Sequence, residues 1–129
     1  MSGPRRQLLH SLLLLALLTP LHCVAQDSDS PVEHVVIVWL QDPGNAQQRA
    51  RIIKESQALT SIPGVLSLKS GSVVKSERAI VDSSFDVALV VSFANQATLD
   101  NYLAHPIHVT LVEETLKPLV ARIQVYDFR

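Results

Sequence analysis

Two apolar stretches of this chain carry hydrophobic side chains on both faces of the β-strands that they predict, and this feature constrains the fold most. Residues 32–40 read Val-Glu-His-Val-Val-Ile-Val-Trp-Leu, and residues 85–93 read Phe-Asp-Val-Ala-Leu-Val-Val-Ser-Phe. Side chains alternate across a strand. One face of each strand is therefore strongly apolar (Val32, Val36, Val38 and Leu40; Phe85, Val87, Leu89, Val91 and Phe93). The opposite face is apolar as well (Val35, Ile37 and Trp39; Ala88 and Val90). A sheet built from these strands must bury both of its faces.

The segments around these strands predict the order β-α-β-β-α-β. Asn45 can cap a helix over residues 46–61, which Pro63-Gly64 ends. Residues 65–74 predict a strand with a bulge or bend at 70–72, and residues 122–128 predict the last strand. A second helix begins near Asn95, is interrupted at His105-Pro106 and then resumes. This order is the ferredoxin-like α+β arrangement, in which we expect the strands that flank each helix to be parallel neighbours and the second and third strands to pair antiparallel.

One copy of such a chain cannot cover both faces of its sheet, because both helices lie on the same side. At about 25 cal/mol per Å² of apolar surface, a bare second face would forfeit a large part of the ~5–15 kcal/mol by which a domain is stable. We therefore predict a homodimer in which two sheets close into a barrel. The alternative is a monomer whose polar connection, residues 75–84, covers the second face.

The first 25 residues have the features of a secretory signal peptide. Arg5 and Arg6 precede an almost continuous apolar run over residues 8–18, and Ala25 provides a small residue before Gln26. The run is about half of the ~20 residues that a membrane-spanning helix needs. We expect cleavage after Ala25 and a secreted or periplasmic protein. The alternatives are a retained N-terminal anchor and a lipid anchor on Cys23, although Leu21-His22 precede that cysteine where small residues are usual.

Cleavage after Ala25 would leave a domain without cysteine and with few positive charges. Cys23 is the only cysteine, so neither a disulfide nor a thiolate metal site could form. Loss of Arg5 and Arg6 changes the formal charge from −1 to −3 and leaves no lysine or arginine cluster, which argues against nucleic acid or an anionic membrane as a partner. We expect residues 26–31 to be a disordered leader and residues 32–129 to be the folded domain.

Several segments of this domain, taken together, resemble the stress-responsive A/B barrel (Dabb) family. Residues 102–109, Tyr-Leu-Ala-His-Pro-Ile-His-Val, are similar to the tyrosine-x-x-His-Pro-x-His segment of that family. The strands at 32–40 and 85–93, the Ser-Ile-Pro-Gly-Val segment at 61–65 and the Val-Tyr-Asp-Phe segment at 125–128 fit as well. The resemblance spans residues 32–128 and implies a dimeric α+β barrel without implying one activity.

The family includes plant stress-associated proteins without a settled reaction and a plant polyketide cyclase. The resemblance implies that Tyr102 and His108 stand at the catalytic positions of the cyclase, with His34 and His105 nearby. Glu55 stands where the cyclase has a pocket tyrosine. Because of this difference, the resemblance does not imply the substrate of the cyclase for this chain.

The chemistry of these side chains suits proton abstraction next to a carbonyl. His108 can act as general base because imidazole titrates near neutrality, and Tyr102 can donate a hydrogen bond to the enolate oxygen. The structural alternative is that His105 caps the broken helix and His108 bonds a backbone carbonyl. His34, His105 and Trp39 are candidate ligand-binding residues, with the core as the alternative place for His34 and Trp39. No carboxylate or cysteine lies at a recognised ligand spacing from the histidines, so we predict neither metal nor cofactor.

Three functional hypotheses remain open. The first is a homodimer that binds a small apolar molecule between sheet and helices. The second is a cyclase-like enzyme that uses His108 and Tyr102. The third is a non-catalytic, stress-protective assembly.

Overall fold

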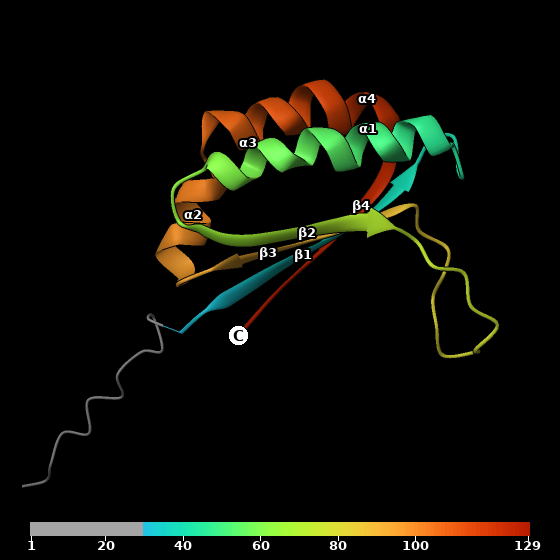
Figure 1. Cartoon of the computed structure of the whole chain (residues 1–129), viewed down its shortest axis with the longest axis horizontal. Coiled ribbons are helices and arrows are strands. Elements are labelled where there is room, and N and C mark those ends of the chain that lie inside the picture. The colour runs from blue at the N-terminus through green and yellow to red at the C-terminus, as the bar shows by residue number, and fades with distance from the viewer. Residues whose placement is uncertain (1–29) are drawn as a thin grey trace, which may run out of the picture.

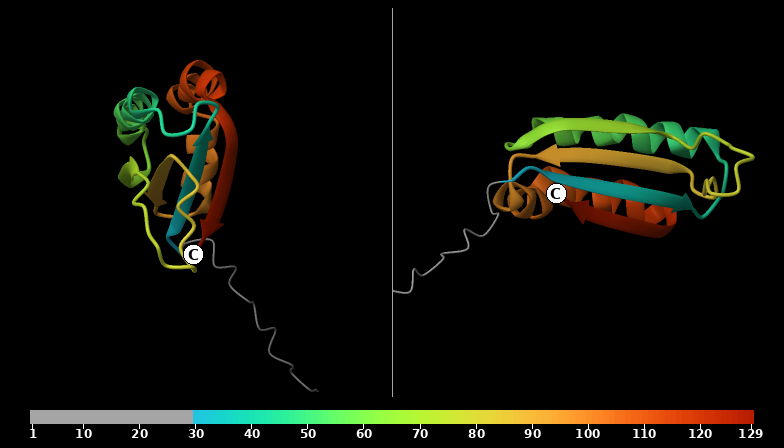
Figure 2. Two further views of the ribbon diagram at one scale, coloured as in Figure 1. Left: turned by 90° about the vertical axis from the view of Figure 1, so that its right-hand side faces the viewer. Right: turned by 90° about the horizontal axis from the view of Figure 1, so that it is seen from below.

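A four-stranded sheet with helices on one face forms the protein in the computed structural model, which describes residues 30–129 (Figure 1). The strands are β1 (Val32–Leu40), β2 (Val65–Ser72), β3 (Val87–Phe93) and β4 (Val120–Phe128). Their order across the sheet is β2-β3-β1-β4 (Figure 2, right). The element order and the ferredoxin-like α+β fold are as predicted.

Every neighbouring pair of strands is antiparallel, so the prediction that the strands flanking each helix are parallel neighbours is wrong. β1 pairs with β3 and β4, and β2 pairs with β3. β1 and β2 run in the same direction, but β3 lies between them because the helical crossover skips one strand position. The expected antiparallel pairing of β2 with β3 is confirmed.

The helical layer has two parts that lie side by side over the sheet (Figure 1). The first part is α1 (Ala46–Ser56), which continues as a 3₁₀ segment η1 (Gln57–Ser61). The second consists of α2 (Gln96–Leu103) and α3 (Pro106–Thr110), followed by a π-helical stretch η2 (Leu111–Leu116) and the short α4 (Lys117–Leu119).

Capping residues fix where these helices begin and end. The side chain of Asn45 accepts a hydrogen bond from the Gln48 backbone N–H at the start of α1. Asn95 forms a reciprocal capping box with Thr98 at the start of α2. Gly64 has a φ of +93°, a backbone conformation that favours glycine, so the turn predicted after η1 is present.

The chain breaks between α2 and α3 at the predicted His105-Pro106. His105 has extended backbone, and Pro106 occupies the first turn of α3. The break turns α3 back along the sheet, and it places α2 and α3 on either side of the same corner of the domain (Figure 1).

The core lies between the sheet and the helices. Val38, Val87, Val91, Phe93, Ile52 and Leu99 are all fully buried there. Residues directly opposite one another in a sheet share a face, so the even-numbered residues of β1 and the odd-numbered residues of β3 face the helices.

The opposite face of the sheet, which we call the outer face, has no helix of the described chain over it (Figure 2, right). Val35 and Val90 lie opposite each other at its centre, and both are partly exposed. Tyr126 and Phe128 of β4 are 57% and 54% exposed. A single copy thus leaves the second apolar face of the sheet uncovered, as its sequence indicated.

Two details of the strands differ from the sequence interpretation. The irregularity in β2 lies between Val65 and Ser67, and pairing with β3 is regular at residues 70–72. Phe85 precedes β3, and its ring packs edge-on at 6.4 Å from Trp39 instead of joining the helix side. Paired register with β1 begins at Val87, so strict alternation does not extend back to Phe85.

The predicted signal peptide, its cleavage after Ala25, Cys23 and most of the 26–31 leader lie outside the described residues. Among residues 30–129, none of the helices combines the length and apolar character needed to cross a bilayer.

Candidate functional site

A cavity of about 230 Å³ lies between the sheet and the second part of the helical layer. Three of its lining residues carry polar groups, namely His34 from β1, Tyr102 from α2 and His108 from α3. The rest of the lining is apolar: Val36, Leu59, Leu89, Leu103, Leu111, Val112, Leu116, Ile123 and Val125. An apolar cavity with a few convergent polar groups is the usual form of a small-molecule site.

His34 is fixed at the sheet by a carboxylate. Its Nδ1 atom lies 2.6 Å from Oδ1 of Asp127 on the neighbouring strand β4. A carboxylate accepts hydrogen bonds, so Nδ1 of His34 carries a proton. His34 is 4% exposed, whereas the side chain of Asp127 is 43% exposed.

Tyr102 lies between the two histidines. Its ring centroid is 5.9 Å from that of His34, 4.7 Å from that of His108 and 4.9 Å from that of Phe93. Burial raises the pKa of the Tyr102 phenol to about 12, so the hydroxyl stays a neutral donor at physiological pH. Within residues 30–129, no side chain or backbone group forms a hydrogen bond with this hydroxyl, which leaves it available to a ligand.

His108 has the properties of a neutral base. Its Nδ1 atom lies 3.1 Å from the backbone oxygen of Leu103, which can only accept, so Nδ1 carries the proton and Nε2 is the basic atom. Burial lowers the pKa of His108, the bond to Leu103 opposes this shift, and the nearby His34 adds to it. The imidazole therefore remains uncharged at neutral pH.

The hydrogen bonds of the histidine segment are those of the structural alternative, and His108 lines the cavity in addition. The side chain of His105 caps α3 by accepting a hydrogen bond from the Ile107 N–H at 3.2 Å, and it does not line the cavity. His108 bonds a backbone carbonyl and lines the cavity as well. The helix break explains both, because it directs His105 to the helix terminus and leaves His108 one turn further on.

Trp39 lies away from the cavity. Its indole N–H donates to Ser84 Oγ at 3.0 Å, and the Arg122 guanidinium stacks over its ring at 3.7 Å. Alternation along β1 places Trp39 on the outer face. The structure therefore brings together His34, Tyr102 and His108, and it places Trp39 and His105 elsewhere.

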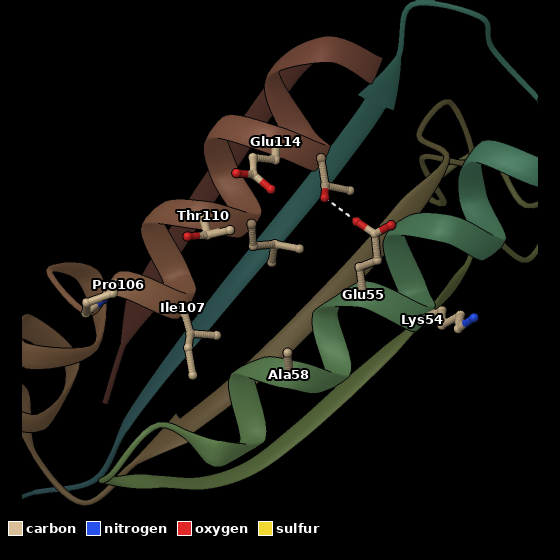
Figure 3. Close-up of a pocket in the computed structure, with 9 residues that line it drawn as sticks. Lys54, Glu55, Ala58, Pro106, Ile107, Thr110 and Glu114 are labelled. Carbon is tan, nitrogen blue, oxygen red and sulfur yellow. Dashed lines mark hydrogen bonds between the residues drawn. The ribbon is translucent and has the colours of Figure 1, made fainter.

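A second hollow of about 470 Å³ runs between α1 and the facing helices (Figure 3). Glu55 reaches across it to accept a hydrogen bond from Thr115, and it also pairs with Arg51 at 2.9 Å. The hydrogen bond from Thr115, together with Arg51, lowers the pKa of Glu55. Because the carboxylate is already satisfied and no histidine lines this hollow, we take the smaller cavity as the candidate site.

Within residues 30–129, no three histidine, cysteine or acidic side chains lie close enough together to hold an ion. His34, Tyr102 and His108 bring two imidazoles and one phenol to the cavity.

Sequence reasoning missed Asp127, which orients His34. No local motif marks this residue. The pairing of His34 with Asp127 follows from the antiparallel register of β1 with β4. The sequence analysis predicted β4 as a parallel neighbour of β3, and that prediction does not give the register of β4 with β1.

Comparisons with known proteins agree with this fold. Residues 32–129 match the family model described as Stress responsive A/B Barrel Domain. A stress-response A/B barrel domain-containing protein of Arabidopsis thaliana is 25% identical over 123 residues, which cover 92% of this chain and 46% of that protein. The chain thus spans about half the length of the curated relative that it matches.

Solved structures share the arrangement of strands and helices. A hydroxynitrile lyase from Passiflora edulis is 21% identical with a TM-score of 0.66, covering 78% of this chain and 93% of that one. A dimeric ferredoxin-like protein of unknown function from Thermobifida fusca is 18% identical with a TM-score of 0.62, covering 76% and 89%. At these identities the likeness establishes the fold.

Proposed function

Because this chain belongs to the stress responsive A/B barrel domain family, we propose that it is an exported protein that pairs with a second copy and binds a small, mostly apolar molecule. The binding site is the cavity of His34, Tyr102 and His108. The observation that carries the proposal is the convergence of these three side chains, from three separate elements, on one otherwise apolar cavity.

The cavity itself supports a small ligand with one polar end. At about 230 Å³ it lies below the ~300–1,000 Å³ typical of sites for drug-sized molecules, so the ligand is small. The unpaired Tyr102 hydroxyl can donate to a carbonyl oxygen, and the apolar walls suit a ring or short chain.

Pairing with a second copy is supported by the outer face of the sheet. The centre of this face, at Val35 and Val90, is apolar, and the rings of Tyr126 and Phe128 are exposed. Contact with a second copy would remove this apolar surface from water. The similar protein from Thermobifida fusca is described as dimeric. Export rests on the sequence alone, on the basic and apolar pattern of residues 1–25.

A binding experiment with acetophenone tests the ligand proposal, because this compound joins an apolar ring to a carbonyl. We expect saturable binding that shifts the imidazole NMR signals of His34 and His108. Tyr102→Phe should weaken binding about tenfold, whereas Tyr126→Phe, on the outer face, is the matched control and should leave it unchanged. Binding that is insensitive to Tyr102→Phe would contradict the assignment of the cavity.

A second function, catalysis of proton transfer at carbon, is favoured by the contact between Tyr102 and His108. Nε2 of His108 removes a proton from the carbon next to the carbonyl, and the electron pair moves to the carbonyl oxygen as an enolate. Tyr102 donates a hydrogen bond to that oxygen, and the proton then returns from His108 to carbon. A hydroxynitrile lyase has the same fold, so the fold can accommodate an enzyme.

Exchange of the methyl protons of acetophenone in D₂O separates the two functions. If the site is catalytic, the exchange rate should exceed the buffer rate, and His108→Ala should reduce it by about 10²–10⁴-fold while circular dichroism stays unchanged. If acetophenone binds without faster exchange, the protein is a binding module. A large heat-resistant oligomer that binds no acetophenone would instead favour a protective assembly.

A further inference from the structure

The walls of the cavity differ greatly in their exposure to water. Its sides at β1 and β3 are closed, since His34 and Leu89 are each 4% exposed; at α2, Tyr102 is 2% exposed, whereas Leu103 at the end of that helix is 39% exposed. Its side at β4 is open, since Ile123 and Val125 line the cavity and are each 40% exposed. One protomer thus builds a site with an apolar wall that faces water.

The position of β4 in the sheet explains this opening. β4 is an edge strand that pairs only with β1, and its residues from Ala121 to Phe128 are all exposed (Figure 2, right). Register with β1 places Ile123, Val125 and Asp127 on the side of the sheet that faces the helices. The helices cover these three side chains only in part: Ile123 and Val125 are each 40% exposed, and the Asp127 side chain is 43% exposed, at this edge of the sheet (Figure 2, left).

We infer that the second copy completes the cavity. One edge strand of that copy, with the segment that flanks it, packs against β4. Ile123, Val125 and Asp127 thereby lose contact with water. This inference rests on the proposed homodimer and adds that the ligand site is incomplete without it.

The geometry of the sheet favours a second copy as the cover. Each four-stranded sheet has two free edges, β2 and β4, and an uncovered apolar outer face. When two such sheets pack by their outer faces and close into a barrel, each free edge gains a neighbouring strand. The segment of the second copy that flanks its edge strand then lies next to the exposed side of the cavity.

Closure of the cavity by a second copy should increase its affinity for a ligand. A ligand that contacts Ile123 and Val125 in a closed cavity buries more apolar surface than in an open one. Anything that binds the dimer better than the monomer also stabilises the dimer by the same factor. Ligand affinity should therefore fall when the copies separate.

A thiol placed on the open wall tests closure without any ligand. In a chain with Cys23→Ser, Val125→Cys provides the sole thiol, because Cys23 is the only natural cysteine. Val35→Lys or Val90→Lys, at the centre of the outer face and outside the cavity lining, should separate the copies. Val109→Lys, on α3 at an exposed site, is the control and should leave the dimer intact.

The expected result is at least tenfold slower labelling of the introduced thiol by a water-soluble maleimide in the dimer than in either monomeric variant. Acetophenone affinity should be at least tenfold weaker in the monomeric variants, with Val109→Lys unchanged. Sedimentation gives the assembly state and circular dichroism the fold. If both lysine variants unfold, dilution of the cysteine-bearing dimer below its dissociation constant provides the same comparison.

Equal labelling rates in dimer and folded monomer would overturn the inference while leaving the proposed dimer intact. A wild-type chain that sediments as a monomer at micromolar concentration would overturn both. Slower labelling in the dimer with no acetophenone binding would support closure and contradict only the ligand proposal.

Discussion

Nδ1 of His34 lies 2.6 Å from Oδ1 of Asp127, although 93 positions separate the two residues in the chain. The antiparallel register of β1 with β4 creates this contact, and the carboxylate sets which ring nitrogen of His34 carries the proton. The cavity thus receives a histidine with a defined tautomer.

Asp127→Ala should disturb the site more than the fold. The Asp127 side chain is 43% exposed, so we expect the free energy of unfolding to fall by less than about 1 kcal/mol in urea denaturation. Acetophenone affinity should fall several-fold because the His34 ring loses its fixed orientation. Asp100→Ala, at an exposed carboxylate on α2, is the control. Unchanged His34 ring signals in Asp127→Ala would refute the orienting role.

Tyr102→Phe and Tyr102→Ala should have separate effects. The phenylalanine variant removes only a hydroxyl without a hydrogen-bond partner in the described chain, so stability should change by less than about 0.5 kcal/mol while binding weakens. The alanine variant removes a ring that is 2% exposed and should cost about 3–5 kcal/mol. Thermal and urea unfolding distinguish them, and a Tyr102→Phe variant as unstable as Tyr102→Ala would show a hidden structural role for the hydroxyl.

The low pKa of His108 predicts two effects of acid. Burial depresses the folded-state pKa below the ordinary 6.5, so the unfolded chain binds the proton more tightly. The resulting stability is fully present above pH 6.5 and is lost as pH falls through the folded pKa. A catalysed exchange rate should also fall about tenfold per pH unit below that pKa. In His108→Gln, the acid-induced loss of stability should be smaller, and an identical loss would exclude His108 as its source.

Asp86 should be the carboxylate on which the fold depends most. It is 2% exposed and accepts hydrogen bonds from the Leu40 and Gly44 N–H groups and from the Arg49 guanidinium at 2.8–3.0 Å. Burial alone would raise the pKa of Asp86, but these donors lower it below its ordinary 3.8. Asp86→Ala should cost about 3–5 kcal/mol, because it leaves Arg49 and two backbone groups unpaired.

The exposed pair Lys117–Glu113 offers the control for Asp86, since Glu113→Ala should change stability by less than about 1 kcal/mol in the same urea titration. The contribution of Asp86 is present above pH 3.8 and is lost as pH falls through its folded pKa. A loss in Asp86→Ala no larger than in Glu113→Ala would show that the buried network adds little.

Much of the secondary structure could be predicted because its signals are local. Asn45, Asn95 and Pro106 mark helix starts through hydrogen bonds and backbone restraints within a few residues. The strand at 65–74 was less accurate, since its real irregularity near Val65 depends on pairing with β3, which no local pattern reveals.

The candidate site was predicted in part. His34, Tyr102 and His108 were singled out through chemistry and a family resemblance, and the structure places them in one cavity. Trp39 does not line this cavity; alternation assigns it a face of β1 without saying which face meets the helices. His105 was drawn into the site by its motif, whereas the helix break uses it as a cap.

The order of strands and helices and the apolar character of both sheet faces follow from local patterns in the amino-acid sequence. These properties depend on residues two to four positions apart, whose periodicity is written in the chain. Three features depend on the folded domain as a whole: β1 lies between β3 and β4, Asp127 therefore contacts His34, and β4 leaves one wall of the cavity exposed. Such contacts join distant segments, and the choice among possible strand pairings depends on how the whole sheet packs against its helices.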